Sequence, residues 1–276
     1  MTAVQNASSS EQVSEPAHLP PVTDRRPHVT IRGLSKQFDN TVIYDKFDLD
    51  IPRGELISIF GPNGCGKSTL INIIAGIIPA DAGEVLFDGM LLKEIKFGYV
   101  FQNYREALFP WMSALDNIGY PLKFMKVPIE ERRARAETLV ARLGIKLNLG
   151  LFPYQMSGGQ QQLVSIMRAL VVEPEILFLD EPFSALDYEM TLFMREQLQR
   201  LFMESGTTMV LVSHDLEEAV YLADRVLLLS RYPARVADFT PVAAPRPRGL
   251  STLSEPGFVR TKAHCLDVFQ REVRRS

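Results

Sequence analysis

A glycine-rich segment between a strand-like run and a helix-like run limits most strongly how this chain can fold. Apolar residues fill 56–60 before it and 70–74 after it, and the segment itself reads Gly61-Pro62-Asn63-Gly64-Cys65-Gly66-Lys67-Ser68-Thr69. This spacing and context predict a phosphate-binding loop, in which glycines let backbone N–H groups face phosphate oxygens at the positive end of a helix. We expect Lys67 to reach the β- and γ-phosphates and Ser68 to ligate Mg²⁺. A plain glycine-rich turn is the alternative, and the loop alone indicates only a nucleoside triphosphate.

The overall composition is that of an ordinary globular protein. Of 276 residues, 46% are hydrophobic and 23% are charged, and the formal net charge of -3 provides no overall basic field, so no nucleic-acid partner is expected. The two cysteines, Cys65 and Cys265, have no metal-ligand spacing and suit a reducing cytosol. We find no apolar run near the roughly 18 residues that cross a bilayer and no signal-peptide core, so work at a membrane is expected to go through a partner.

The chain divides into three parts. Residues 1–27 have almost no large apolar residues and predict a disordered tail, because such a segment cannot offset its ordering entropy. Residues 28–240 predict a folded α/β domain. Residues 241–276 predict a Pro/Arg-rich linker followed by a terminal helix. In that helix we expect one face to be shared by Val259, Leu266, Phe269 and Val273.

Within the domain, the residue pattern changes from one typical of β-strands to one typical of helices, and then back to strands alternating with helices. Short β-rich stretches at 29–34 and 42–44, followed by alternation of apolar and acidic residues over 47–51, predict a half-solvated antiparallel sheet. The stretch at about 103–165 predicts a helical insert. After it, apolar runs separated by a helix predict a parallel sheet covered on both faces. The expected apolar face of the insert is Ile129, Ala136, Val140 and Leu143, and the later apolar runs are 176–179, 209–212 and 226–229.

A pair of carboxylates follows the apolar run 176–179. A strand there would deliver Asp180 and Glu181 to the sheet edge at which ligands bind in such folds. We expect Asp180 to hold Mg²⁺ and Glu181 to orient and polarise the attacking water as a general base. An ordinary acidic pair at a strand end is the alternative interpretation.

Two further features are compatible with a phosphate site but less specific. Ser157, Gly158, Gly159 and Gln160 open a helix-like segment, and a helix N-terminus suits an anion. From physics alone, a simple helix cap is the favoured interpretation. His214 ends another strand-like run and would reach the same sheet edge, although a lone histidine at a strand end is usually structural.

Taken together, these residues resemble a known family. In order and spacing they are similar to the Walker A, Q-loop, signature, Walker B, D-loop and H-loop motifs of ABC transporter ATPases. The resemblance extends over residues 29–230, and the segments 101–117 and 213–219 look most like the nitrate, sulfonate and taurine importer group. The matching segments are Gly61 to Thr69, Gln102, Ser157 to Gln160, Ile176 to Glu181, Ser184 to Asp187, and His214.

The resemblance implies an α/β fold: a P-loop NTPase core of ABC ATPase type, with an antiparallel β subdomain and an α-helical insert subdomain. It makes 28–240 the ABC ATPase domain and implies ATP and Mg²⁺ as cofactors. Phe38 matches the aromatic residue that stacks on adenine, with a core phenylalanine as the alternative. Gln102 matches the residue that senses Mg²⁺ and the attacking water. The implied catalytic set is Glu181, His214 and Gln102; the implied metal set is Ser68, Gln102 and Asp180; the implied nucleotide-binding set is Phe38, Gly61, Pro62, Asn63, Gly64, Cys65, Gly66, Lys67, Ser68, Thr69, Ser157, Gly158, Gly159, Gln160 and Asp187.

The resemblance also implies partners. Members of the family work as head-to-tail nucleotide sandwiches, so Ser157 and Gly159 of one chain would contact the γ-phosphate held by Lys67 of another. The segment from Gln102 to Trp111 looks like the surface that receives a membrane permease, with plain core as the alternative for Phe109 and Trp111. The implied function is ATP hydrolysis that powers import of a small anion such as nitrate, sulfonate or taurine. The protein would lie on the cytoplasmic face of the cell membrane, with an external substrate-binding protein as a further partner.

Some residues depart from the family pattern, and two other functions stay open. The family usually has basic residues at the positions of Gln161 and Leu163 and a small residue at that of Met167, which puts coupling at this helix in doubt. A soluble ABC ATPase outside transport is one alternative, although the chain shows neither heptads nor a second cassette. A non-catalytic nucleotide-binding regulator is the other, although both Glu181 and His214 are present.

Overall fold

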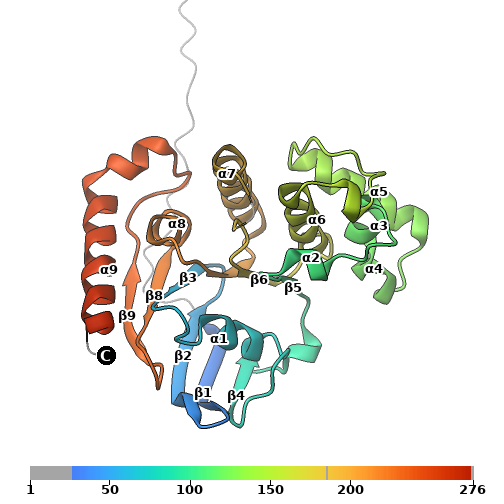
Figure 1. Ribbon diagram of the computed structural model, residues 1–276. Helices are drawn as coiled ribbons and strands as arrows, with labels where there is room; N and C mark the ends of the chain where they lie inside the picture. Colours follow the sequence, from blue (N-terminus) through green and yellow to red (C-terminus); the bar gives the residue numbers. More distant parts are fainter. Residues whose placement is uncertain (1–26, 185, 275–276) are drawn as a thin grey trace, which may run out of the picture.

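A three-stranded antiparallel sheet forms one layer of the molecule. The computed structural model describes residues 27–184 and 186–274 (Figure 1). The predicted tail therefore lies outside the described residues, except for Pro27, which begins the first strand. The sheet order is β2-β1-β4, with bounds β1 Pro27–Phe38, β2 Thr41–Pro52 and β4 Ala82–Phe87. Both pairings of β1 are antiparallel, as the alternating sequence predicts.

A six-stranded sheet forms the centre of the molecule. Its order is β5-β6-β7-β3-β8-β9, and only the edge strand β9 runs antiparallel to its neighbour. Parallel neighbours β3 and β7 are far apart in sequence and need crossover connections, which the helices supply. The bounds are β3 Leu56–Phe60, β5 Phe97–Val100, β6 Ile176–Asp180, β7 Thr208–Val212, β8 Arg225–Leu229 and β9 Val236–Pro241.

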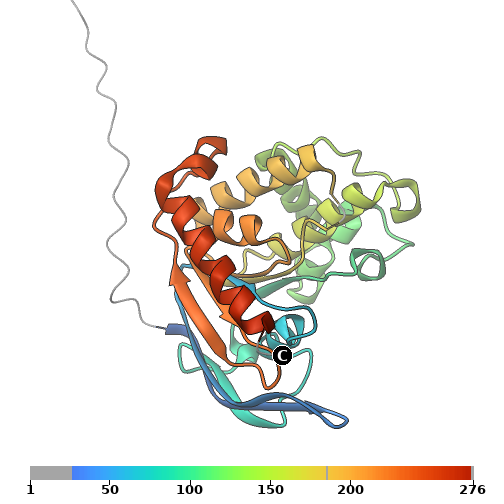
Figure 2. The same cartoon turned by 60° about the vertical axis from the view of Figure 1, so that its left-hand side comes forward.

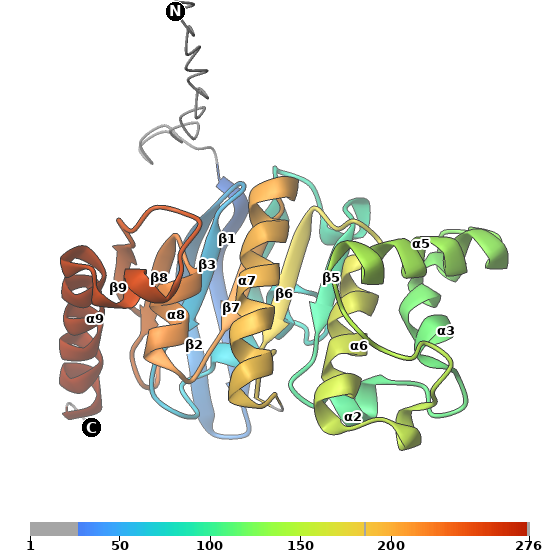
Figure 3. The same ribbon diagram turned by 90° about the horizontal axis from the view of Figure 1, so that it is seen from above.

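Both faces of the inner strands β6, β7, β3 and β8 are buried, which explains why these strands are almost uniformly apolar. Successive residues of a strand point to opposite faces. Ile57 and Ile59 pack into a cluster with α1 and the antiparallel sheet, whereas Leu56 and Phe60 pack into a second cluster on the other face. Figure 3 shows α7 and α8 lying across the central strands. The helix bounds are α1 Lys67–Ile74, α7 Tyr188–Ser205 and α8 Leu216–Leu222.

The helical insert lies beside β5 at one end of the molecule (Figures 1 and 3). Ala136, Val140 and Leu143 are buried there as predicted, whereas Ile129, at the start of α5, is 48% exposed. A short 3₁₀ turn, η2 (Pro153–Gln155), precedes the last helix of the insert. The insert contains α2 Tyr104–Ala107, α3 Ala114–Gly119, α4 Pro121–Phe124, α5 Ile129–Arg142 and α6 Gly158–Leu170.

The terminal helix α9 (Pro256–Arg274) runs along the outer side of β9 (Figure 2). The predicted apolar face of this helix is wrong at Val259 and Leu266, whereas Phe269 packs against the core as predicted. Val259 and Leu266 are 49% and 43% exposed, and the buried face is formed by Phe258, Cys265 and Val268. The face is rotated by about one residue because Phe258, the larger side chain, packs inward at the start of the helix. Two further 3₁₀ turns are η1 Leu92–Glu94 and η3 Leu250–Ser254.

Among the helices that the structure describes, none is both long enough and apolar enough to span a bilayer.

Candidate active site

The carboxyl ends of the parallel strands border an open pocket. Strands β3, β6 and β7 end side by side, and in parallel sheets ligands bind at this edge. The pocket has a volume of about 520 Å³. It brings together residues from four separate sequence motifs. They are Asn63, Gly64, Gly66, Lys67, Ser68, Thr69, Gln102, Glu181 and His214.

The glycine-rich loop wraps the start of α1 as the sequence predicts. The Lys67 ammonium is buried and donates to the carbonyl oxygens of Gly61 and Pro62 at 3.0 and 3.1 Å. Gly66 has φ of 105°, and a Cβ there would lie 2.7 Å from Ile43, so the position requires glycine. Both partners are neutral carbonyl oxygens, and a basic side chain at a helix N-terminus suits an anion.

The Ser68 hydroxyl and the Asp180 carboxylate are suited to hold Mg²⁺. Ser68 Oγ donates to Asp180 Oδ1 at 3.0 Å, so two hard oxygen ligands meet at the pocket. Burial raises the pKa of Asp180 to about 6, against the opposing hydrogen bond from Ser68, and a cation would offset the buried charge. No cluster of three or more acidic, His or Cys ligands occurs in the described ranges. This donor set fits Mg²⁺ held jointly by protein and phosphate oxygens.

Glu181 is held by two neighbours from different elements. Gln102 Nε2 donates to Glu181 Oε2 at 3.0 Å, and His214 Nδ1 lies 3.4 Å from the same oxygen. Glu181 has φ of 48°, a left-handed conformation that is uncommon for a residue with a side chain. Its N–H donates to Val212 O at 3.0 Å, which ties the end of β6 to that of β7. Such strain at a pocket, fixed by surrounding contacts, is typical of functional sites.

The signature segment lies away from this pocket. Ser157 Oγ accepts from the Gln160 N–H at 3.3 Å, and the Gln160 side chain accepts from the Ser157 N–H at 2.9 Å. This reciprocal pair caps α6, so within one chain the helix-cap interpretation describes the segment. Gly158 and Gly159 form the first turn of α6, and a Cβ on Gly158 would meet the Tyr104 hydroxyl at 2.7 Å.

Asp187 and Phe38 are also outside the pocket lining, as are Gly61, Pro62 and Cys65 of the phosphate loop. Asp187 accepts from the Met190 N–H at 2.8 Å and caps α7. Phe38 ends β1, is 43% exposed, and has the Lys36 ammonium 5.1 Å from its ring centroid. Within a single chain, neither residue therefore lines this pocket.

The atypical residues of α6 have structural roles. Gln161 Nε2 donates to the carbonyl oxygens of Pro153 and Met156 at 2.9 and 3.2 Å and so fastens η2 to the helix. Leu163 and Met167 are 3% and 0% exposed and pack in the core. At both positions the structure therefore favours an apolar side chain.

Sequence reasoning did not single out two tyrosines that hold the loop. The Tyr44 hydroxyl donates to Gly66 O at 2.9 Å, and the Tyr232 hydroxyl donates to Gly64 O. Both side chains reach the loop from elements distant in sequence. No spacing pattern within the loop could therefore have indicated them.

Comparison with known proteins places this geometry in a family. Residues 44–184 match the ABC transporter family. The chain is 44% identical over 206 residues to the spermidine/putrescine import ATP-binding protein PotA of Marinobacter nauticus, which covers 73% of this chain and 55% of that protein. It is 40% identical over 213 residues to the sulfate/thiosulfate import ATP-binding protein CysA of Neisseria meningitidis, covering 73% and 58%. The chain thus spans just over half the length of these two relatives.

One relative matches over nearly its whole length. It is an uncharacterized ABC transporter ATP-binding protein of Methanocaldococcus jannaschii, 35% identical over 255 residues, covering 89% of this chain and 92% of that protein.

Solved structures agree with the fold. The dimeric structure of a bacterial ABC transporter cassette has a TM-score of 0.71 and 31% identity and covers 79% of this chain and 100% of that chain. A second dimeric structure, a post-hydrolysis state bound to ADP and Pi, has a TM-score of 0.70, 31% identity and the same coverage. These neighbours confirm the predicted fold class.

Proposed function

Because this chain belongs to the ABC transporter ATP-binding family, we propose that it is the ATP-hydrolysing subunit of a membrane importer. The observation that carries this proposal is that Lys67 and Glu181 line one pocket on the carboxyl edge of the sheet. Asp180 adjoins this pocket through its hydrogen bond with Ser68, which also lines it. These three groups come from two motifs, and they are a cation, a carboxylate suited to a metal ion and a base fixed by its neighbours. Phosphoryl transfer to water requires these parts.

The phosphate loop and the carboxylates bind different parts of Mg²⁺-ATP. Bound Mg²⁺-ATP supplies the phosphoanhydride bond to be cleaved and the divalent charge that offsets the phosphates. Lys67 and the N–H groups at the start of α1 bind the β- and γ-phosphates. Ser68, Gln102 and Asp180 would hold the metal ion.

Glu181 accepts the proton of the attacking water at its carboxylate. Because Gln102 and His214 both contact Oε2, the plane of the carboxylate is fixed, and the water meets the base in one orientation. This pre-organisation lowers the cost of positioning during the reaction.

The site is completed by a second copy of the chain in a head-to-tail dimer. Within one chain, Ser157 and Gly159 start α6 and do not line the pocket, which leaves them available to a nucleotide held by the partner copy. Asp187 would lie at the same interface, and Phe38 would stack on adenine. The dimeric cassettes among the solved relatives support this arrangement. Hydrolysis then releases the two copies, because the shared γ-phosphate is lost.

The helical insert offers a surface for the permease. A groove of about 310 Å³ there is bounded by Trp111, Tyr120 and Phe152. Trp111 is 69% exposed and Phe124, nearby on α4, is 74% exposed, which is unusual for large apolar residues of a folded domain. We assign this groove to the cytoplasmic segments of integral permease subunits. The protein would then lie peripherally on the cytoplasmic face of the membrane.

The cargo proposal rests on motif resemblance. Relatives of the chain are named for spermidine/putrescine, sulfate/thiosulfate and sn-glycerol-3-phosphate import, so their names support import but no single cargo. The segments 101–117 and 213–219 favour a small anion such as nitrate, sulfonate or taurine, delivered by an external substrate-binding protein.

Mg²⁺-dependent ATP hydrolysis, measured as a function of chain concentration, tests the proposal. A site shared between two copies predicts turnover that rises faster than linearly until dimers saturate. The Glu181→Gln chain is the control for contaminating activity. Turnover strictly proportional to concentration would contradict the shared site, and turnover equal to that of the control would contradict hydrolysis by this pocket.

A further inference from the structure

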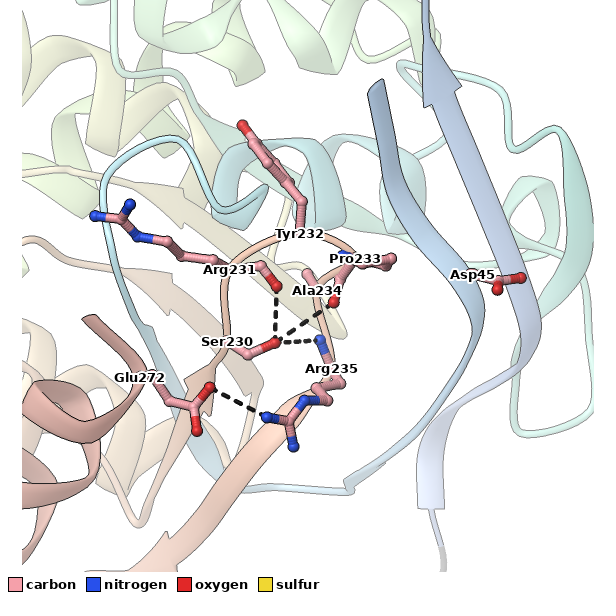
Figure 4. Close-up of a pocket in the computed structure, with 8 residues that line it drawn as sticks. All are labelled: Asp45, Ser230, Arg231, Tyr232, Pro233, Ala234, Arg235 and Glu272. Atoms are coloured by element: carbon pink, nitrogen blue, oxygen red, sulfur yellow. Dashed lines mark hydrogen bonds and ion pairs between the residues drawn. The ribbon is translucent and has the colours of Figure 1, made fainter. Parts of the chain in front are cut away.

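The turn between β8 and β9 lies beside the phosphate loop. Because β8 is paired with β3, the turn after β8 and the loop after β3 leave the sheet at the same edge. The turn, residues 230–235, forms one wall of a second cavity of about 600 Å³, with Asp45 and Glu272 on the other walls. Figure 4 shows Tyr232 extending from this turn on the side opposite to Arg235 and Glu272.

Tyr232 holds the tip of the phosphate loop. Its hydroxyl donates to the carbonyl oxygen of Gly64, and a Cβ built on Gly64 would lie 3.3 Å from that hydroxyl. A peptide unit is planar, so fixing the Gly64 carbonyl also fixes the direction of the Cys65 N–H. That N–H donates to Pro62 O at 3.2 Å. One hydroxyl therefore supports the whole turn from Pro62 to Cys65.

Tyr44 makes the matching contact two residues further on. Its hydroxyl is fully buried and donates to Gly66 O at 2.9 Å. Gly64 and Gly66 have φ of 77° and 105°. Glycine adopts such values easily because it lacks a Cβ, and for the same reason its peptide can rotate to other conformations. Two hydroxyls thus restrain two peptides of the loop, those that carry the Gly64 and Gly66 carbonyl groups. Restraint before the ligand arrives lowers the ordering cost of binding.

The turn that carries Tyr232 is anchored at its base. The Arg235 N–H donates to Ser230 Oγ at 3.0 Å, which closes the turn on itself. The Ala234 N–H donates to Ile43 O at 2.7 Å, which fastens the turn to β2 beside Tyr44. Tyr232 therefore extends from a rigid support.

Helix α9 reaches the same region from behind. The Arg235 guanidinium contacts the Glu272 carboxylate at 3.3 Å, and the Glu272 side chain is only 8% exposed. One turn earlier, the Phe269 ring lies 5.1 Å from that of Phe60, the last residue before the phosphate loop. The end of α9 thus contacts both the turn and the strand that leads into the loop.

We propose that Tyr232 is a positioning residue for the phosphate loop, and that α9 supports it through the contact between Glu272 and Arg235. This inference rests on the proposed nucleotide-binding function. Tyr232 does not touch the nucleotide in this scheme; it reduces the freedom of the Gly64 peptide so that the loop is already arranged for phosphate.

Equilibrium binding of Mg²⁺-ATP and Mg²⁺-ADP to the full chain tests this proposal. Tyr232→Phe removes one neutral hydrogen bond, so we expect the Kd of both nucleotides to rise roughly three- to tenfold. KM should rise with it and kcat should stay close to that of the parent, because the loop binds substrate and transition state alike. The nucleotide-free chain should melt close to the parent temperature.

Two further variants sharpen the comparison. Tyr221→Phe is the matched control, since the Tyr221 hydroxyl also donates to one backbone carbonyl, that of Arg248, at 2.6 Å but away from the loop. Its nucleotide affinity should equal that of the parent. Glu272→Gln removes the charge that holds Arg235 and should weaken nucleotide binding in the same direction as Tyr232→Phe, but less.

The outcomes separate this proposal from the function on which it rests. Parental affinity in Tyr232→Phe, together with weakened binding in Lys67→Ala, would overturn the role of Tyr232 alone. A fall in kcat with unchanged affinity would also overturn it. If the parent and Lys67→Ala do not differ in ATP affinity, both the nucleotide site and the positioning role fail.

Discussion

At the scale of single residues, Lys67 is the side chain on which nucleotide affinity depends most. Its buried ammonium donates to two backbone carbonyl oxygens, and the residue lines the pocket. Lys67→Ala removes a charged donor to phosphate, which is worth about 10- to 100-fold in affinity. The expected result is that much weaker ATP binding by equilibrium titration, with the melting temperature of the free chain little changed. Unchanged ATP affinity would contradict the assignment of the loop.

Glu181 should govern turnover rather than binding. Glu181→Gln keeps the shape of the side chain but removes the basic oxygen, and a general base contributes about 100- to 10,000-fold to rate. We expect ATP binding to persist and an ATP-dependent dimer to accumulate, measured by gel filtration with Mg²⁺-ATP. Equal turnover in variant and parent would show that another group takes the proton.

The sequence could predict the position of site residues that directly follow a recognisable strand. Asp180 and Glu181 come immediately after an apolar run, and a strand end in a parallel sheet places them at the ligand edge. Tyr44 and Tyr232 could not be predicted in this way. They reach the loop across 22 and 168 residues of chain, and contacts made by tertiary approach leave no pattern in the local sequence.

At the scale of elements, His28 joins the two sheets. It lies on β1, is fully buried, and its Nδ1 is 2.6 Å from Thr208 Oγ1 on β7. Burial, and to a lesser degree the nearby Arg53, lowers the pKa of His28 to about 4. The folded state therefore favours neutral His28, whereas the unfolded chain protonates it near its usual pKa of 6.5.

The sign of the resulting pH dependence follows from this lowered pKa. The stabilising contribution is complete above about pH 6.5 and is lost as the pH falls toward about 4. We expect the free energy of unfolding of the parent to decrease between pH 7 and pH 5, measured by denaturant titration. In His28→Gln this part of the decrease should disappear. Parallel curves for the two proteins would contradict the role of His28.

The elements themselves were predictable to different degrees. The inner strands of the central sheet have both faces buried, so their near-continuous apolar runs indicated them clearly. Strand β1 extends well past the predicted 29–34, because backbone pairing with β2 and β4 continues beyond its most apolar residues. The order of strands in the sheet depends on long-range pairing, and periodicity does not contain that information. In α9, Phe258 and Val259 are adjacent and both apolar, so the sequence did not indicate which of them begins the buried face.

At the scale of the whole molecule, the shared site can be tested by mixing two defective chains. Lys67→Ala disables the loop, and Ser157→Arg blocks the signature segment of the opposite chain. Each homodimer then has two defective sites, whereas a mixed dimer has one intact site. We expect turnover of the mixture to exceed the sum of the two chains measured separately.

The mixing experiment needs its own control for folding. Ser157 caps α6, and loss of such a cap costs about 1 kcal/mol of stability. The Ser157→Arg chain should therefore still melt cooperatively. If the properly folded variants give only additive turnover, each chain contains a complete site of its own.

The burial of both cysteines makes this chain convenient for spectroscopic labelling. Cys65 and Cys265 are 2% and 0% exposed, and burial raises the pKa of both thiols, so a maleimide dye should react slowly with either. A single cysteine introduced by Arg274→Cys, in the last turn of α9, would be the preferred site of attachment. A fluorophore there would sit within a turn of Glu272, so its emission could be followed in real time while nucleotide enters the pocket.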